Sequence, residues 1–179
     1  LSRLSRTYAQ HVCKIITDQM GLSFSYDMTK EDKWKMGELC GFSNSVIVSK
    51  HPSCRIRPNE KLVLEKKVLG KEIKRISDSD VIFELGSEQV GFVSIDITSD
   101  TEQDILVAYG EHIVDGNVRR IIGPRDFSFK MRLRKGKNKY LNPFRRLGAR
   151  YLEIKSESPV TVNEAAITPT MYPVTLKTK

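Results

Sequence analysis

The chain has 179 residues and a mass of 20.4 kDa, which suits one ordinary domain, alone or with a small appendage. Hydrophobic residues make up 39% of it and charged residues 29%, a balance that excludes a disordered tail. No run approaches the roughly 18 to 20 apolar residues of a membrane-spanning helix, so we expect no membrane span. Residues 1–6 contain no apolar region typical of a signal peptide, and the sequence leaves the compartment open.

The first 53 residues differ in character from the rest, and we interpret them as an N-terminal segment, either a linker or the end of a preceding domain. Thr7–Gln10 match a helix capping box, Gly21 is a helix stop signal, and apolar residues between them recur at helical spacing. These signals predict one helix over residues 8–20. A short strand is predicted further along, at Val46–Val48.

After Cys54 the hydrophobic pattern changes to a period of two. Apolar residues alternate with polar ones in five stretches: Val81, Phe83 and Leu85; Val93, Ile95 and Ile97; Ile105, Val107 and Tyr109; Phe127, Phe129, Met131 and Leu133; Leu152 and Ile154. Strict alternation indicates strands with one buried and one solvated face, which is typical of antiparallel sheets.

Turn signals separate these stretches. Asp115-Gly116 stands between apolar residues and is typical of a two-residue hairpin loop, in which both residues need positive φ. Ser99–Thr101 and Lys135–Asn138 also have the composition of turns. Several short strands joined by turns, without helices between them, predict a mainly β fold: an antiparallel β-sandwich of jelly-roll or Greek-key type over residues 54–175.

The formal net charge of +8 is concentrated in one segment. Residues Arg119–Arg150 hold 12 basic residues and one acid, Asp126, for a local net charge of +11, whereas the remainder carries −3. The bases Lys130, Arg132 and Arg134 fall on the outward positions of a predicted strand, where solubility alone requires polar side chains. The rest of the cluster needs another explanation.

No arrangement of acids and bases points to catalysis by this chain. Glu111, His112 and Asp115 form the best local group for acid–base chemistry. However, adjacent residues of a strand point to opposite faces, and Asp115 is explained by its turn. We therefore expect no catalytic residue.

The three cysteines, Cys13, Cys40 and Cys54, are too few and odd in number for a disulfide framework, so we expect reduced thiols. Two of them have a nearby histidine, His11 or His51. Neither pair has a second pair at the spacing of a zinc site. The sequence predicts no metal and no cofactor.

Four blocks of sequence follow one another between Phe83 and Glu153. They are F-E-L-G-S-E-Q-V-G-F-V at Phe83–Val93, Tyr109-Gly110-Glu111 followed by Asp115-Gly116, Arg125-Asp126-Phe127, and F-R-R-L-G-A-R-Y-L-E at Phe144–Glu153. In this order they resemble the motifs of an accessory β-sandwich domain in the bacterial α-L-rhamnosidases, a family of glycoside hydrolases. Within the first block, we expect Gly86 and Gly91 to mark a bend or a close approach of two backbones.

The resemblance implies a non-catalytic accessory domain. In that family the sandwich accompanies a catalytic (α/α) barrel, and the long amphipathic helices of such a barrel do not occur in this sequence. Glycoside hydrolysis needs a pair of carboxyl groups, which the barrel would supply, so no catalytic residue is carried over. The expected partner is the catalytic barrel of the same parent polypeptide. That parent is expected to be an α-L-rhamnosidase-like hydrolase, periplasmic or secreted.

Three hypotheses for the role of the chain itself follow. An arginine-rich edge docks an acidic partner domain or a ligand, through Arg119, Arg120, Arg125, Arg145, Arg146 and Arg150. Alternatively, the chain is a free-standing carbohydrate-binding module, with an aromatic platform formed by Trp34, Tyr109, Tyr140 and Phe144. Nucleic-acid binding by the basic segment is the least favoured hypothesis, because its phenylalanines are assigned to the inward face and few aromatic rings remain for stacking.

Overall fold

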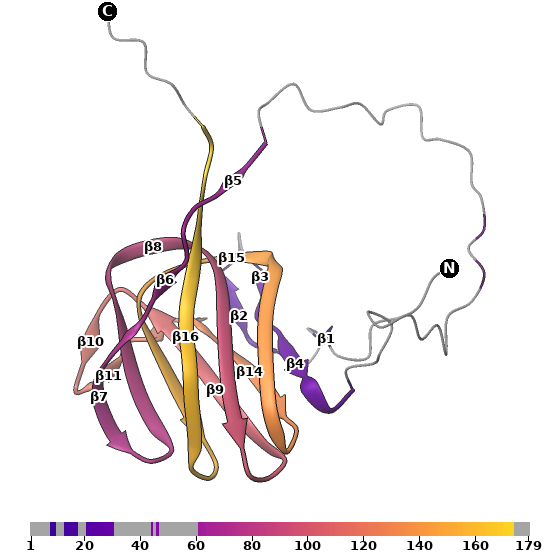
Figure 1. The fold of residues 1–179 in the computed structure, drawn as a ribbon. Coiled ribbons are helices and arrows are strands. Elements are labelled where there is room, and N and C mark those ends of the chain that lie inside the picture. Colours follow the sequence, from indigo (N-terminus) through magenta and orange to yellow (C-terminus); the bar gives the residue numbers. More distant parts are fainter. Residues whose placement is uncertain are drawn as a thin grey trace, which may run out of the picture.

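The computed structural model describes residues 8–9, 13–17, 21–30, 44, 46 and 61–173, with the backbone alone for Tyr8, Ala9, Pro143 and Phe144. Strands make up most of this part of the chain (Figure 1). Before residue 80 they are β1 (Tyr8–Ala9), β2 (Ile15–Thr17), β3 (Gly21–Leu22), β4 (Ser25–Asp27), β5 (Val63–Leu64), β6 (Val68–Leu69) and β7 (Lys71–Ser77). From residue 80 they are β8 (Asp80–Ser99), β9 (Gln103–Gly110), β10 (Ile113–Val114), β11 (Asn117–Val118), β12 (Ile121–Ile122), β13 (Arg125–Asp126), β14 (Ser128–Leu133), β15 (Gly136–Ser156) and β16 (Val160–Met171).

One large sheet dominates the fold. Within the described residues it has ten strands, in the order β1-β4-β14-β9-β15-β8-β16-β5, with β6 paired to β16 and β7 paired to β8. Its pairs are antiparallel, except that β4 runs parallel to β14. The prediction of a mainly β, largely antiparallel fold is confirmed.

The sheet curls because its two longest strands, β8 and β15, bend. The first part of β8, Asp80–Glu84, pairs with β7 and with the end of β15, whereas its last part, Gly91–Ser99, pairs with β16 and with the start of β15. The register of β15 shifts twice between Leu141 and Tyr151, and β-bulges of this kind bend a strand. The two halves of the sheet therefore enclose a common core (Figure 1).

The predicted alternation identifies the core residues. Val93, Ile95 and Ile97 from one half of the sheet and Phe129, Met131 and Leu133 from the other are all buried in one cluster. Phe127, just before β14, is half-buried and packs against the same cluster. Burial of these side chains is the main favourable contribution to folding.

The two glycines of the first sequence block act as predicted. Gly86 has a φ of 81° and lies where β8 bends. At Gly91 the neighbouring strand β16 approaches so closely that a Cβ would overlap the carbonyl oxygen of Thr168. Only glycine fits this crossing without a shift of the backbone.

The predicted hairpin at Asp115-Gly116 is also confirmed. These two residues connect β10 to β11 and have φ values of 51° and 79°, as a type I′ loop requires. In the predicted turn between β8 and β9, Ser99 Oγ donates a 2.8 Å hydrogen bond to the carbonyl oxygen of Thr101.

The prediction of a helix over residues 8–20 is wrong. The described residues of this stretch form β1 and β2, and the helix found in the described chain is the short 3-10 turn η1 (Met28–Lys30). Ile15 is 48% exposed whereas Ile16 is fully buried, which is the alternation of a strand. Of the predicted strand Val46–Val48, Val46 is exposed and outside any strand, and its last two residues lie outside the described ranges. No helix of the described residues is long and apolar enough to cross a bilayer.

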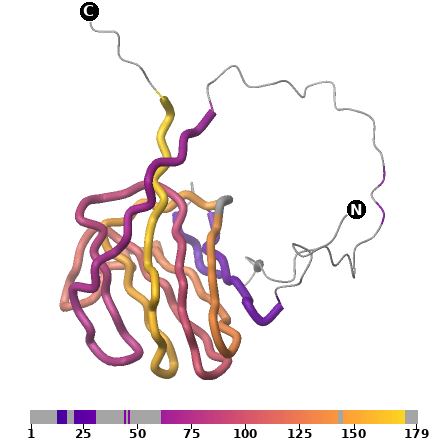
Figure 2. The backbone as a smooth tube through the Cα atoms, in the orientation of Figure 1, coloured from indigo at the N-terminus to yellow at the C-terminus, as the bar shows by residue number. Residues whose placement is uncertain are grey.

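The N-terminal strands belong to the same body (Figure 2). Phe24, only 2% exposed, stacks on Phe129 with ring centroids 4.6 Å apart, and Met28 is fully buried in the core. The amide of Lys130 donates to the carbonyl oxygen of Phe24 at 3.2 Å. Part of the 1–53 segment therefore supplies β4 as a flanking strand, while the predicted domain boundary at residue 54 stays a prediction.

Candidate functional site

A groove of about 940 Å3 lies where the N-terminal strands meet the rest of the large sheet. It is lined by β4 and its flanking loops on one side, and by β9, β14 and Asp126 on the other. Its carboxylates are paired with bases: Asp27 with Lys30 at 3.0 Å, Asp104 with Arg132 at 3.2 Å, and Asp126 with Arg120 at 2.6 Å. This groove is the candidate site, and the protonation state of its carboxyl groups limits the chemistry that it could perform.

Asp126 is a buried anchor within this groove. Arg120 Nη1 and Ser128 Oγ donate to its Oδ1 at 2.6 and 2.7 Å, and Lys14 Nζ lies 3.7 Å from its Oδ2. Burial alone would raise the pKa of Asp126, but these hydrogen bonds and charges outweigh it and hold the pKa below the ordinary 3.8. The ionised carboxylate ties β13 and β14 to the N-terminal strands.

Asp27 is held in a similar way. Its Oδ1 accepts hydrogen bonds from the amide and the hydroxyl of Thr29, at 3.0 and 2.5 Å, and Lys30 lies at its other oxygen. Burial alone would raise the pKa of Asp27, but these partners lower it. A glycosidase needs one carboxyl group that stays protonated, so neither Asp27 nor Asp126 has the electrostatics of a general acid.

A second carboxylate anchor lies on β15. Glu153 is fully buried, and its Oε2 accepts a 3.0 Å hydrogen bond from the amide of Val118, while Lys155 Nζ lies 3.0 Å from its Oε1. Burial raises the pKa of Glu153, and these partners offset the rise only in part. Lys155 also donates to Asp80 and Asn117, at 2.8 Å each. The group fastens the β10–β11 hairpin and the start of β8 to β15.

Three of the six predicted docking arginines bind within the chain. Arg120 is the partner of Asp126. Arg145 Nη2 donates to the carbonyl oxygen of Leu22 at 2.9 Å, and Arg150 donates twice to Glu84 Oε1, at 3.0 and 2.6 Å. These guanidinium groups hold together elements of this fold.

The other three arginines have exposed or largely accessible side chains. Arg119 precedes β12, Arg125 lies on β13 opposite Ile122, and Arg146 lies on β15 opposite Phe92 of β8. Within the described part of the chain, none of the three forms an ion pair. The six arginines therefore do not act as one set, and their role in docking stays a prediction.

The charge of the basic segment is partly offset by acids from neighbouring strands. Arg132 pairs with Asp104 of β9, and Lys137 and Lys139 lie 3.4 and 3.8 Å from Asp96 Oδ2 of β8. The local net charge of +11 counted along the sequence thus overstates the field at this surface.

The described members of the predicted sugar platform are core residues. Tyr109 and Tyr140 are only 2% and 4% exposed, and the ring of Tyr140 stacks on Phe129 at 5.6 Å. Burial raises the pKa of the Tyr109 hydroxyl. Trp34 lies outside the described residues, and only the backbone of Phe144 is described. No aromatic ring of this set is placed at the described surface.

The remaining candidates are the cysteines and their neighbouring histidines. Cys13 is half-buried, while Cys40, Cys54, His11 and His51 lie outside the described residues. In the described ranges no three His, Cys, Asp or Glu side chains gather as metal ligands.

Sequence reasoning did not foresee the roles of Asp126 and Glu153. Both lie in the recognised blocks, Arg125–Phe127 and Phe144–Glu153, which was the available signal. Their partners lie on other strands, and Val118 precedes Glu153 by 35 residues.

The sequence was compared with the models of known protein families. The family described as the bacterial α-L-rhamnosidase concanavalin-like domain matches residues 74–171. No curated protein gives a significant match.

Three solved rhamnosidase structures are similar to parts of this chain. An α-L-rhamnosidase from Streptomyces avermitilis, solved with L-rhamnose, matches 92% of this chain with 16% identity and a TM-score of 0.63. One from Dictyoglumus thermophilum matches 84% with 16% identity and a TM-score of 0.62. A GH78 family rhamnosidase from Bacillus sp. GL1 is 26% identical over 54% of this chain, with a TM-score of 0.46.

The chain spans only 16%, 18% and 10% of these three structures, respectively. At 16% identity, the first two likenesses establish a shared fold. The family match covers more than half of this chain, and the chain therefore belongs to the bacterial α-L-rhamnosidase concanavalin-like domain family.

Proposed function

We propose that this chain is the non-catalytic accessory β-sandwich domain of an α-L-rhamnosidase-like glycoside hydrolase, in which it packs on and supports the catalytic domain. The observation that carries the proposal is the family match over residues 74–171, in a chain that spans less than a fifth of the rhamnosidases with the same fold. A unit of this size within a much longer polypeptide is one domain among several.

The curled sheet serves as the sandwich. Strands β5 to β16 supply its main body, and β4 from the 1–53 segment adds a flanking strand. Two opposed halves that share β8 and β15 give a rigid block, and such a block suits a supporting role next to a catalytic domain.

The acids of the described residues favour the non-catalytic role. Asp27 and Asp126 have lowered pKa values and fixed partners. Glu153 has the raised pKa of a general acid, but it is fully buried and is held by Val118 and Lys155. Glycoside hydrolysis needs two carboxyl groups on either side of an open sugar pocket, so the hydrolytic pair belongs to another domain in this proposal.

In this proposal, the side chains that contact the other domain are those that have no ion-pair or hydrogen-bond partner within the described part of this chain. Of the arginine-rich edge, Arg119, Arg125 and Arg146 are available, because Arg120, Arg145 and Arg150 have partners within the chain. Guanidinium groups suit carboxylates of a neighbouring surface.

The test compares the isolated chain with the full polypeptide that carries it, using an aryl α-L-rhamnoside and measuring release of the aryl group. We expect release by the full polypeptide and none by the isolated chain. Hydrolysis by the isolated chain would refute the non-catalytic role, and an inactive full polypeptide would refute the rhamnosidase assignment. The triple change Arg119→Glu, Arg125→Glu and Arg146→Glu should lower the Tm of the full polypeptide more than that of the isolated chain.

A further inference from the structure

A two-stranded ribbon rises clear of the curled sheet (Figure 1). It consists of β5 and the end of β16, with Val63 opposite Met171 and Leu64 opposite Thr170. The amide of Glu65 donates to the carbonyl oxygen of Pro169 at 2.9 Å and continues the ladder toward the sheet. A ribbon of two strands is marginally stable in water when nothing covers it.

Large apolar side chains of this ribbon are exposed. Val63 and Met171, which face each other across the ribbon, are 42% and 48% exposed, and Leu64 and Tyr172 are 59% and 54% exposed. Apolar residues thus occur on both faces of a thin element. Leaving such area in water forgoes about 25 cal/mol for each Å2, and contiguous apolar patches mark interaction sites.

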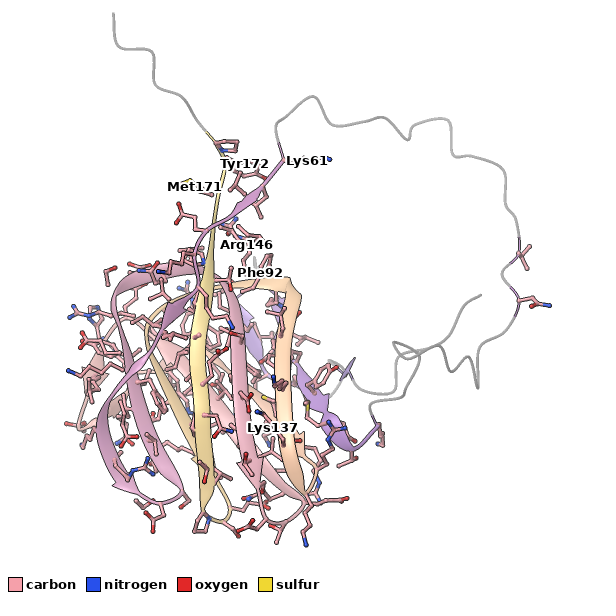
Figure 3. All side chains as sticks on the ribbon, in the orientation of Figure 1. Lys61, Phe92, Lys137, Arg146, Met171 and Tyr172 are labelled. Carbon is pink, nitrogen blue, oxygen red and sulfur yellow. The ribbon has the colours of Figure 1, made fainter. Side chains whose placement is uncertain are left out.

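The base of the ribbon continues this surface. The exposed residue Val90 lies there, since its carbonyl oxygen accepts a hydrogen bond from Thr170 Oγ1 at 3.4 Å. Arg146 lies two residue pairs further along the sheet, opposite Phe92 (Figure 3). Figure 3 also places Lys61, Met171 and Tyr172 along the ribbon above them.

Two positive charges border this apolar surface. Within the described residues, Arg146 and Lys61 form no ion pair, whereas other bases of the sheet, such as Arg132, have carboxylate partners. An apolar centre with a charged rim is the usual composition of a protein–protein contact.

The flanking strand β7 provides a contrast. Its two isoleucines, Ile73 and Ile76, are also exposed, but they alternate with charged residues along a strand whose register shifts twice. Arg75 is paired with Glu72 at 2.7 Å. Charges and bulges on an edge strand prevent it from pairing with a strand of another domain or molecule. Strand β7 is protected in this way, and the ribbon is not.

We infer that this end of the molecule is the surface by which the chain docks on a further domain of the same polypeptide. The ribbon end comprises Lys61, Val63, Leu64, Val90, Arg146, Met171 and Tyr172. The occupant presents an apolar patch bordered by carboxylates that meet Arg146 and Lys61. The rhamnosidases with this fold are several times longer than the chain, which provides such an occupant. The inference rests on the proposed function for the presence of that domain.

The test uses the full polypeptide that carries this chain, and the isolated chain beside it. The double change Leu64→Ser and Met171→Ser removes apolar contacts from the ribbon end. The matched control is Ile73→Ser and Ile76→Ser, two exposed side chains of β7. We expect the ribbon variant to lower the Tm of the full polypeptide by at least about 2 °C and to leave that of the isolated chain within the range of the control.

Hydrogen exchange gives a second measurement that needs no variant. The amides of residues 61–65 and 170–172 should exchange more slowly in the full polypeptide than in the isolated chain, and those of β7 should not differ. Equal exchange in both, or equal effects of the two double variants, would overturn the inference. So would a dimer of the isolated chain that the ribbon variant dissociates, because the occupant would then be a second copy.

Activity separates this inference from the proposed function. If the polypeptide hydrolyses aryl rhamnosides but the ribbon end exchanges freely, the docking surface is refuted and the proposed function stands. If the ribbon end is protected in a polypeptide that lacks rhamnosidase activity, the docking surface stands and the proposed function is refuted.

Discussion

The Glu153 carboxylate and the Val118 amide are joined by a 3.0 Å hydrogen bond that holds the β10–β11 hairpin on β15. Both groups are buried, so neither can turn to water if its partner is lost. The hairpin has two residues in each strand, and strands of that length do not persist alone. One buried carboxylate therefore positions an entire hairpin.

Replacing Glu153 by alanine should destabilise the chain by roughly 1 to 3 kcal/mol, because the Val118 amide would be left buried without an acceptor. Glu153→Gln keeps an acceptor oxygen and should cost less. Urea unfolding of the three proteins measures the difference. If the alanine and glutamine variants are equally stable, the hydrogen bond does not hold the hairpin.

The same residue predicts a pH dependence. The pKa of Glu153 is raised above its ordinary 4.5, so the folded state keeps its proton over a range in which the unfolded state has lost it. Stability should therefore fall as the pH rises from 4.5 through the raised pKa, and Glu153→Gln should lack this component. A difference between wild type and Glu153→Gln that does not change over this range would contradict the assignment.

Asp126 predicts a pH dependence of stability with the opposite sign. Its pKa is lowered from 3.8, so its contribution is present above 3.8 and is lost as the pH falls through the folded pKa. Asp126→Asn should cost roughly 1.5 to 3 kcal/mol at neutral pH, the usual range for hydrogen bonds to a charged group. The cost should vanish in acid. Asp100→Asn, at an exposed turn, is the control and should change stability by less than about 0.5 kcal/mol.

Phe24→Ala should destabilise the chain by about 3 to 5 kcal/mol, because it leaves a cavity beside Phe129. Ile15→Ala, from the same N-terminal region but 48% exposed, should have little effect. Thermal unfolding followed by circular dichroism compares them. Equal stability of the two variants would mean that the N-terminal strands are dispensable for the fold.

Gly91→Ala should cost about 1 to 3 kcal/mol, since the added Cβ must push β16 away at Thr168. Gly148→Ala is a matched control in the neighbouring strand, where the nearest atom to the added Cβ would be 3.7 Å away. Denaturant midpoints of both variants provide the comparison. A destabilised Gly148 variant beside an unaffected Gly91 variant would contradict the observed crossing of the strands.

The sequence predicts the inward faces of the strands well, because alternation is a local property. Ile95 and Phe129 are buried as expected, and Asp115-Gly116 forms the expected loop. These features depend on neighbouring residues alone, and a single sequence contains that information.

The N-terminal region could not be predicted in this way. The spacing around Ile15 and Ile16 fits a helix as well as a strand, and the choice is made by packing against residues more than 100 positions away, such as Ser128, whose carbonyl oxygen accepts from Ser23 Oγ. The same applies to the candidate site. Arg145 and Arg150 looked available for a partner, and their acceptors, Leu22 and Glu84, lie 123 and 66 residues away in the sequence.

The bends in β8 and β15 have a consequence for how this molecule comes apart. Each of these strands is a single covalent path that enters both halves of the curled sheet, so separating the strands in one half pulls on the ladder of the other. The halves are thus mechanically coupled, and neither can serve as a stable fragment while the other melts. Unfolding by heat or by mechanical force should therefore be a single cooperative transition, without an intermediate in which one half of the sheet is open.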